Sequence, residues 1–159
     1  MSNTDAGTAI STEVVELSTI DMALEVVTVP VSDVERAKRF YQSLGWRLDI
    51  DLDGGDVRIV QMTPPHSQCS IHFGKGITTM EPGSLDRLYL AVNDIDAARE
   101  DLVSRGVEVS KVEERPKPPG FPDFPGRSYF AYASFSDPDG NGWVLQEVTT
   151  RLPGREWDD

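Results

Sequence analysis

The chain has few side chains suited to acid–base or nucleophilic chemistry: two histidines and one cysteine among 159 residues. His72 lies in a strand-like segment between two apolar residues. Facing a cavity, its imidazole could act as a general base near neutral pH, and a structural role is the alternative. His66 follows two prolines in a turn-like segment, so we expect it to be exposed. A lone thiol, Cys69, forms no internal disulfide and needs an activating base to be a nucleophile, so we expect it to pack as a small apolar residue.

Composition narrows the classes of partner. The formal net charge of −12 repels nucleic acid phosphates and anionic lipid. No stretch approaches the roughly 20 apolar residues of a membrane-spanning helix, and the N-terminus lacks the basic and then apolar pattern of a secretory signal. We therefore expect a cytoplasmic protein with no nucleic-acid and no membrane partner.

An internal repeat predicts the elements that position these residues. Residues 31–46 and 92–107 share a Val-x-Asp sequence, a helix-like stretch and a glycine at the same spacing in both copies. Apolar strand-like runs precede them at 24–29 and 85–92. Ser32 and Glu35 have the spacing of a capping box for the first helix, and Asn93 or Asp94 caps the second. Glycines end both helices.

Three strand-like segments follow each helix, at 47–52, 57–63 and 70–73, and again at 107–112, 129–136 and 142–149. The predicted fold class is α+β, with two tandem βαβββ modules at 22–80 and 84–150 of a single domain at 21–150. We expect flexible tails at 1–20 and 151–159. A short extra strand at 13–17 is an alternative for the first tail.

One segment breaks the symmetry of the repeat. Residues 115–127 contain five prolines, which excludes a helix or a central strand, and two phenylalanines, Phe121 and Phe124. A loop of this length is typical of a lid over a binding site. A solvated insertion is the alternative, although the phenylalanines then lack an apolar surface to cover.

These features, with the turn Asp137-Pro138-Asp139-Gly140-Asn141 before the last strand, resemble the vicinal oxygen chelate superfamily of glyoxalases, bleomycin-resistance proteins and extradiol dioxygenases. The resemblance covers about residues 24–149. It implies a curled eight-stranded mixed sheet around a cavity, with the helices outside, and a homodimer. Its members include lyases, isomerases, dioxygenases and proteins that sequester antibiotics, so the fold alone does not fix the function.

Metal-using members hold a divalent ion with ligands on the first and last strands of each module. The positions that match are Val26, Arg87, Val144, and Ile71 or His72. Valine has no donor atom and arginine stays cationic, so we predict no metal and no other cofactor. A divalent metal at a shifted site is the alternative, built from Glu25, Gln146, Glu147 and His72. It would need a bulge, because neighbouring strand residues face opposite sides.

The resemblance also predicts the residues in or over the cavity: Val26, Thr28, Arg87, Tyr89, Phe121, Phe124, Val144 and Gln146. Arg87 could pair with an acidic group of a ligand, and an internal carboxylate is its alternative partner. We therefore predict a protein that binds a small organic molecule without the usual metal. A metal-dependent or acid–base lyase, isomerase or dioxygenase, with His72 catalytic, is the alternative. A module for protein interactions is the third.

Overall fold

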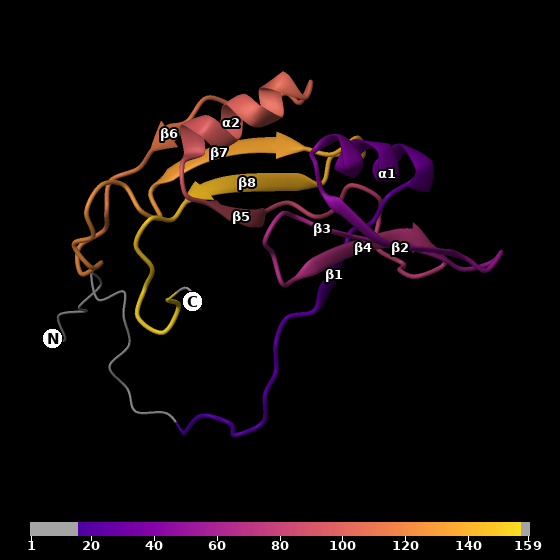
Figure 1. Cartoon of the computed structure of the whole chain (residues 1–159), viewed down its shortest axis with the longest axis horizontal. Helices are drawn as coiled ribbons and strands as arrows, with labels where there is room; N and C mark the ends of the chain where they lie inside the picture. The colour runs from indigo at the N-terminus through magenta and orange to yellow at the C-terminus, as the bar shows by residue number, and fades with distance from the viewer. Residues whose placement is uncertain (1–15, 157–159) are drawn as a thin grey trace, which may run out of the picture.

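The computed structural model describes residues 16–156 and has the expected order of elements. The first module consists of β1 (Val26–Thr28), α1 (Val34–Ser43), β2 (Arg47–Asp53), β3 (Arg58–Thr63) and β4 (Ser70–Lys75). The second consists of β5 (Leu88–Val92), α2 (Ile95–Ser104), β6 (Glu113–Glu114), β7 (Ala131–Ser136) and β8 (Gly142–Glu147). The predicted α+β class and the twofold βαβββ order are confirmed (Figure 1).

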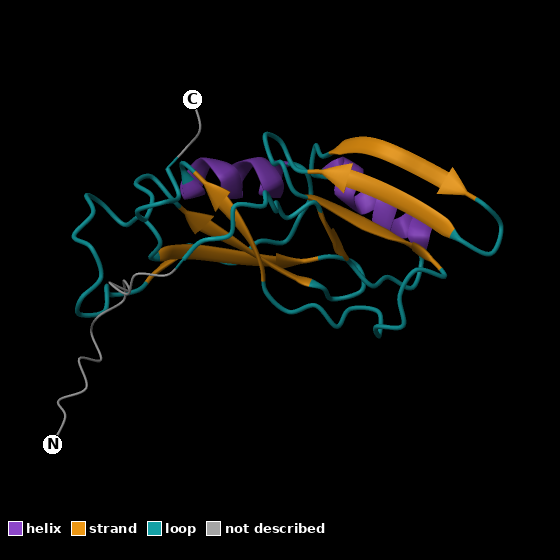
Figure 2. Cartoon of the chain, turned by 90° about the horizontal axis from the view of Figure 1, so that it is seen from below, coloured by secondary structure: helices purple, strands orange, loops and turns teal. Residues whose placement is uncertain are grey.

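Each module forms its own four-stranded mixed sheet, sheet A with the order β1-β4-β3-β2 and sheet B with the order β5-β8-β7-β6. In both, the first strand of the module runs parallel to its last strand. Helix α1 packs on β3 and β4, and α2 packs on β7 and β8. The two sheets stay separate within the chain and do not close into one curled sheet (Figure 2). Each sheet therefore has one helix-covered face and one open face.

Aspartates cap both helices. The Asp33 carboxylate accepts a hydrogen bond from Arg36 N at 3.1 Å, and Asp94 caps α2 in the same way. The capping box predicted at Ser32 is therefore wrong. Ser32 is used elsewhere, because its N–H and its hydroxyl both donate to Asp139 in the turn before β8.

The turn before β8 joins the two modules. The Asn141 side chain donates to the carbonyl oxygen of Pro30 at 2.8 Å and accepts from the backbone N–H of Leu85 at 3.1 Å. Asp139 accepts from Ser32 and forms an ion pair with Arg36 at 3.2 Å. The motif that predicts a turn in the sequence thus also attaches the second module to the first.

The hydrophobic core is shared by the modules. Tyr41 of α1 is fully buried and donates to Asp137 at 2.8 Å, while it accepts from Trp143 Nε1 at 3.0 Å. Trp46 packs edge-on against Trp143 with ring centroids 5.1 Å apart. Aromatic side chains from both modules therefore form one continuous core.

Two terminal or edge predictions differ from the structure. Residues 107–112 form no strand, and only Glu113–Glu114 pairs with β7. The reason lies in Ser110, whose hydroxyl accepts the hydrogen bond from Ser134 N that a ladder carbonyl would otherwise accept. Of the predicted N-terminal tail and strand, residues 1–15 lie outside the described residues, and residues 16–24 run away from the sheets (Figure 1). Glu25, just before β1, already pairs with sheet A, because its carbonyl oxygen accepts a hydrogen bond from Ser70 N at 2.9 Å. Among residues 16–156, no helix is long and apolar enough to cross a membrane.

Candidate ligand-binding site

The strand register places four of the predicted site residues on the open face of sheet B. Tyr89 lies opposite Val144, and Gln146 lies two residues further along β8 on the same side. Arg87 directly precedes β5, and its guanidinium carbon lies 5.8 Å from the centre of the Tyr89 ring. The structure therefore brings Arg87, Tyr89, Val144 and Gln146 together.

The neighbouring residue on β8, Glu147, faces the helix side. Its carboxylate accepts a hydrogen bond from Ile95 N at the start of α2 at 3.0 Å and another from Arg127 Nε at 3.0 Å. These partners hold the carboxylate against α2, so Glu147 is not available to a ligand on the open face. The alternative metal site, built from Glu25, Gln146, Glu147 and His72, would therefore lack the Glu147 carboxylate.

Val26, Thr28 and His72 share the open face of the other sheet, sheet A. Thr28 lies opposite His72 in the register of β1 and β4, and its hydroxyl oxygen is 2.6 Å from His72 Nε2. Partial burial lowers the pKa of His72 and so favours its neutral imidazole. Gln61 of β3 is the other cross-strand neighbour of His72. A neutral imidazole between two polar neighbours can exchange a proton with a ligand on this face.

A cleft of about 750 Å³ opens at the end of sheet B where β5 and β8 begin. Arg87 and Val144 line it, together with Ser134 of β7 and Phe40 of α1. The cleft is large enough for a drug-sized molecule. Its lining is mixed, with the Arg87 cation and apolar side chains beside the acidic residues Asp86, Glu108 and Asp137. His72, on sheet A, is not part of its lining.

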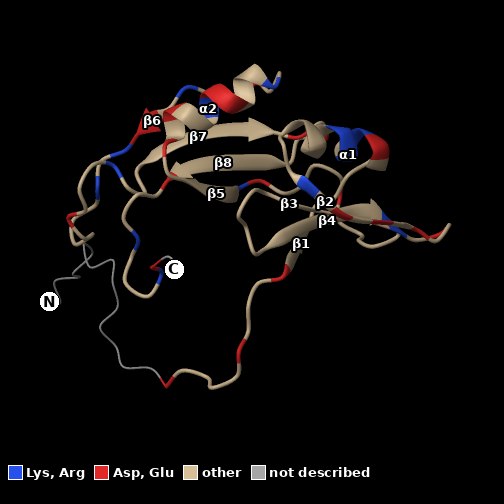
Figure 3. Ribbon diagram, viewed as in Figure 1, with Lys and Arg blue, Asp and Glu red and all other residues tan. Residues whose placement is uncertain are grey.

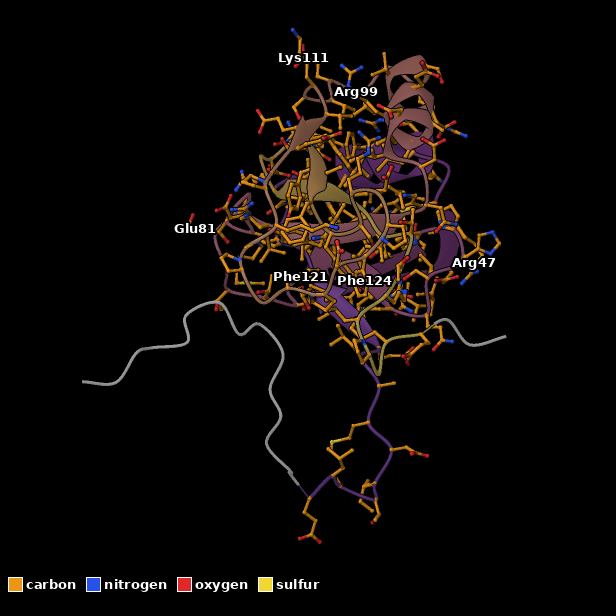
Figure 4. The ribbon with its side chains drawn as sticks, turned by 90° about the vertical axis from the view of Figure 1, so that its left-hand side faces the viewer. Arg47, Glu81, Arg99, Lys111, Phe121 and Phe124 are labelled. Carbon is orange, nitrogen blue, oxygen red and sulfur yellow. The ribbon has the colours of Figure 1, made fainter. Side chains whose placement is uncertain are left out.

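Phe121 and Phe124 lie over the opposite end of sheet B. Their rings are 5.8 Å apart, and Phe121 also packs on Tyr129 and Phe130, just before β7 (Figure 4). Arg87 lies beside the far end of β7, and a strand of six residues spans roughly 20 Å. The two phenylalanines are therefore not placed over Arg87. They lie near Gln146, whose side chain donates to Tyr129 O at 3.1 Å.

Two residues of the open face were missed in the sequence. Tyr132 lies opposite Gln146, and the Arg115 guanidinium carbon is 5.4 Å from the centre of its ring. Tyr132 could have been found, because it alternates with the buried residues Ala131 and Ala133 along β7. Arg115 begins the proline-rich segment, where no periodicity indicates which way a side chain points.

The positions that correspond to metal ligands do not fit a metal. Val26 and Val144 have no donor atoms, and the Arg87 guanidinium offers only donor N–H groups. Within residues 16–156, no three His, Cys, Asp or Glu side chains converge on one point. We derive no catalytic step through a metal.

The family follows from comparison with known proteins. The sequence profile of the Glyoxalase/Bleomycin resistance protein/Dioxygenase superfamily matches residues 23–145. The chain belongs to this superfamily. The resemblance to the vicinal oxygen chelate proteins is thereby confirmed.

Several solved structures are similar to this superfamily member. TnmS3, an antibiotic binding protein from Streptomyces sp. CB03234, is 34% identical, with a TM-score of 0.67 over 83% of this chain and 99% of its own. A glyoxalase/bleomycin resistance protein from the same organism is 35% identical, with a TM-score of 0.63 over 78% of this chain and 99% of its own. A superfamily member from Sphaerobacter thermophilus DSM 20745 is 31% identical, with a TM-score of 0.63 over 80% of this chain and 98% of its own. No curated protein sequence matches the chain significantly.

Proposed function

We propose that this superfamily member binds a small organic molecule of the antibiotic or natural-product kind and does so without the usual metal. The observation that carries the proposal is the cleft of about 750 Å³ lined by Arg87 and Val144. By the resemblance, these two residues match positions where metal-using relatives need donor atoms. In the cleft they supply an apolar side chain and a cation, beside the acidic residues Asp86, Glu108 and Asp137. The similarity to TnmS3, an antibiotic binding protein, supports the same class of ligand.

A homodimer is part of the proposal. The predicted site residues are divided between two open faces, with His72 on sheet A and Arg87 on sheet B, and the two sheets do not close on each other within one chain. A second copy that covers sheet B with its own sheet A would bury both faces and enclose the ligand. A cytoplasmic location, expected from the sequence, stays a prediction.

Binding is tested by thermal shift and calorimetry with a panel of natural-product antibiotics. Ser134→Trp fills the cleft from an exposed position and should abolish binding, whereas Ser43→Trp on α1 makes the same exchange away from the cleft. Loss of binding only in Ser134→Trp supports the cleft. If no compound of the panel binds the wild-type chain, or if both variants bind normally, the proposal fails.

The metal-free part of the proposal has its own test. Elemental analysis of protein purified without chelator is followed by titration with manganese, iron, nickel and zinc. We expect no tight binding of any of them. One tightly bound ion per chain would contradict the metal-free site and favour the enzyme.

An acid–base enzyme is the second candidate, favoured by His72. Burial favours its neutral imidazole, and it lies on an open face beside Thr28. If the bound molecule is converted, His72→Gln should abolish conversion and leave binding intact. Unchanged conversion in that variant would exclude the general-base role.

A further inference from the structure

Two arginine–tyrosine pairs lie on the open face of sheet B. Arg87 covers the ring of Tyr89 at 5.8 Å, and Arg115 covers the ring of Tyr132 at 5.4 Å. Tyr89 comes from β5 and Tyr132 from β7, on either side of β8. The pairs therefore flank β8.

Neither arginine forms an ion pair with any residue between 16 and 156, although the chain has a net charge of −12. Arg127 shows the contrast, because it binds the carboxylates of three acidic residues. A guanidinium that rests on an aromatic ring keeps its N–H donors free for a planar acidic group. Two such cations on one face are therefore available to a ligand.

The surface between the pairs carries no charged side chain and is centred on Val144. Val144 lies between Tyr89 and Ser134, and Gln146 lies between Ala91 and Tyr132. Strands β5 and β7 carry no charged side chain (Figure 3). Two strand spacings and two residues of rise separate the tyrosines by roughly 12 Å. This distance suits a fused ring system rather than a single ring.

We infer that the open face of sheet B binds a planar, fused aromatic ligand that carries an acidic group. Its ring system lies over Val144 between the two tyrosines, and its acidic group binds Arg87 or Arg115. The inference rests on the proposed function and adds the chemical class of the ligand. Glu113 lies opposite Tyr132 on the same face, so its carboxylate works against an acidic ligand at the Arg115 end.

The test compares three probes that share one ring system: 2-naphthoate, 2-naphthamide and 2-naphthylmethylammonium. Their affinities are measured by calorimetry at low salt for the wild-type chain, Arg87→Gln, Arg115→Gln and the double variant. Arg39→Gln on α1 is the matched control, because Arg39 is exposed and loses the same charge away from the face. Glu113→Gln makes the opposite change of charge on the face itself.

We expect 2-naphthoate to bind about tenfold more tightly than 2-naphthamide, the value of one charge-assisted hydrogen bond, and the ammonium probe to bind most weakly. The double variant should lose this preference, Arg39→Gln should keep it and Glu113→Gln should strengthen it. Equal affinity for the three probes, or a preference that survives in the double variant, overturns the acidic class and leaves the proposed function standing. If no probe binds and the antibiotic panel also fails, the proposed function falls with it.

Discussion

Replacing Tyr41 by phenylalanine tests whether a buried hydroxyl holds the two modules together. The ring stays, so the packing against Trp46 and Trp143 is kept, but two hydrogen bonds disappear. Asp137 remains hydrogen-bonded, because it still accepts from Asp139 N and from the backbone and side chain of Asn141. Trp143 Nε1 is left in the core without an acceptor.

The size of the effect follows from these contacts. A stranded buried donor costs about 1–3 kcal/mol, and a hydrogen bond to a carboxylate contributes about 1.5–3 kcal/mol. Asp137 keeps its other donors, so we expect the lower part of the combined range, about 2.5–4 kcal/mol. Measured against a typical unfolding free energy of about 5–15 kcal/mol, this loss is large.

The assay is urea unfolding at pH 7, followed by tryptophan fluorescence. The midpoint should fall with an unchanged dependence on urea, because the surface exposed on unfolding is the same. Tyr89→Phe is the matched control, because its hydroxyl is on a half-exposed ring, and it should change stability by less than about 0.5 kcal/mol. A loss below about 0.5 kcal/mol in Tyr41→Phe as well would refute the role given to the hydroxyl.

Three further predictions concern charges. Hydrogen bonds from Arg58, and then Lys38, lower the pKa of Asp51 to about 2. The ionised carboxylate therefore stabilises the fold fully above pH ~4, and this stabilisation is lost as the pH falls through 2. Asp51→Asn should flatten the pH dependence of the unfolding free energy between these two pH values. Burial lowers the pKa of His72, so its imidazole should titrate below 6.5 by NMR, and a midpoint above 6.5 would contradict its placement on sheet A. Arg127→Gln should lower stability by about 1–2 kcal/mol in urea unfolding, because it removes a charged partner of the largely buried Glu147. An equal loss of stability in Arg39→Gln, which removes an exposed arginine of α1, would show a general effect of charge instead.

Local features of the fold were readable from the sequence. The paired Val-x-Asp and glycine spacings predicted both helices, because capping aspartates and helix-ending glycines act on the nearest turn of backbone. The choice of Asp33 over Ser32 was not readable. It depends on Asp139, which is distant in the sequence and reaches Ser32 only in the folded chain.

For the candidate site, too, the sequence predicted the placement of some residues and not of others. Alternation along β5 and β8 placed Arg87, Tyr89, Val144 and Gln146 on one face, since the period of two is a property of each strand. The positions of Phe121 and Phe124 could not be derived, because a proline-rich loop has no period and its course depends on what it packs against.

By itself, the sequence determined the α+β class, the doubled βαβββ order and the family. These depend on residue type and short spacings along the chain. Only the tertiary structure decided that the modules keep separate sheets, that Glu147 serves α2 and Arg127, and that Arg115 joins Tyr132 on the open face. Such contacts unite segments far apart in the chain, and their energies depend on packing and burial that appear only when the modules meet.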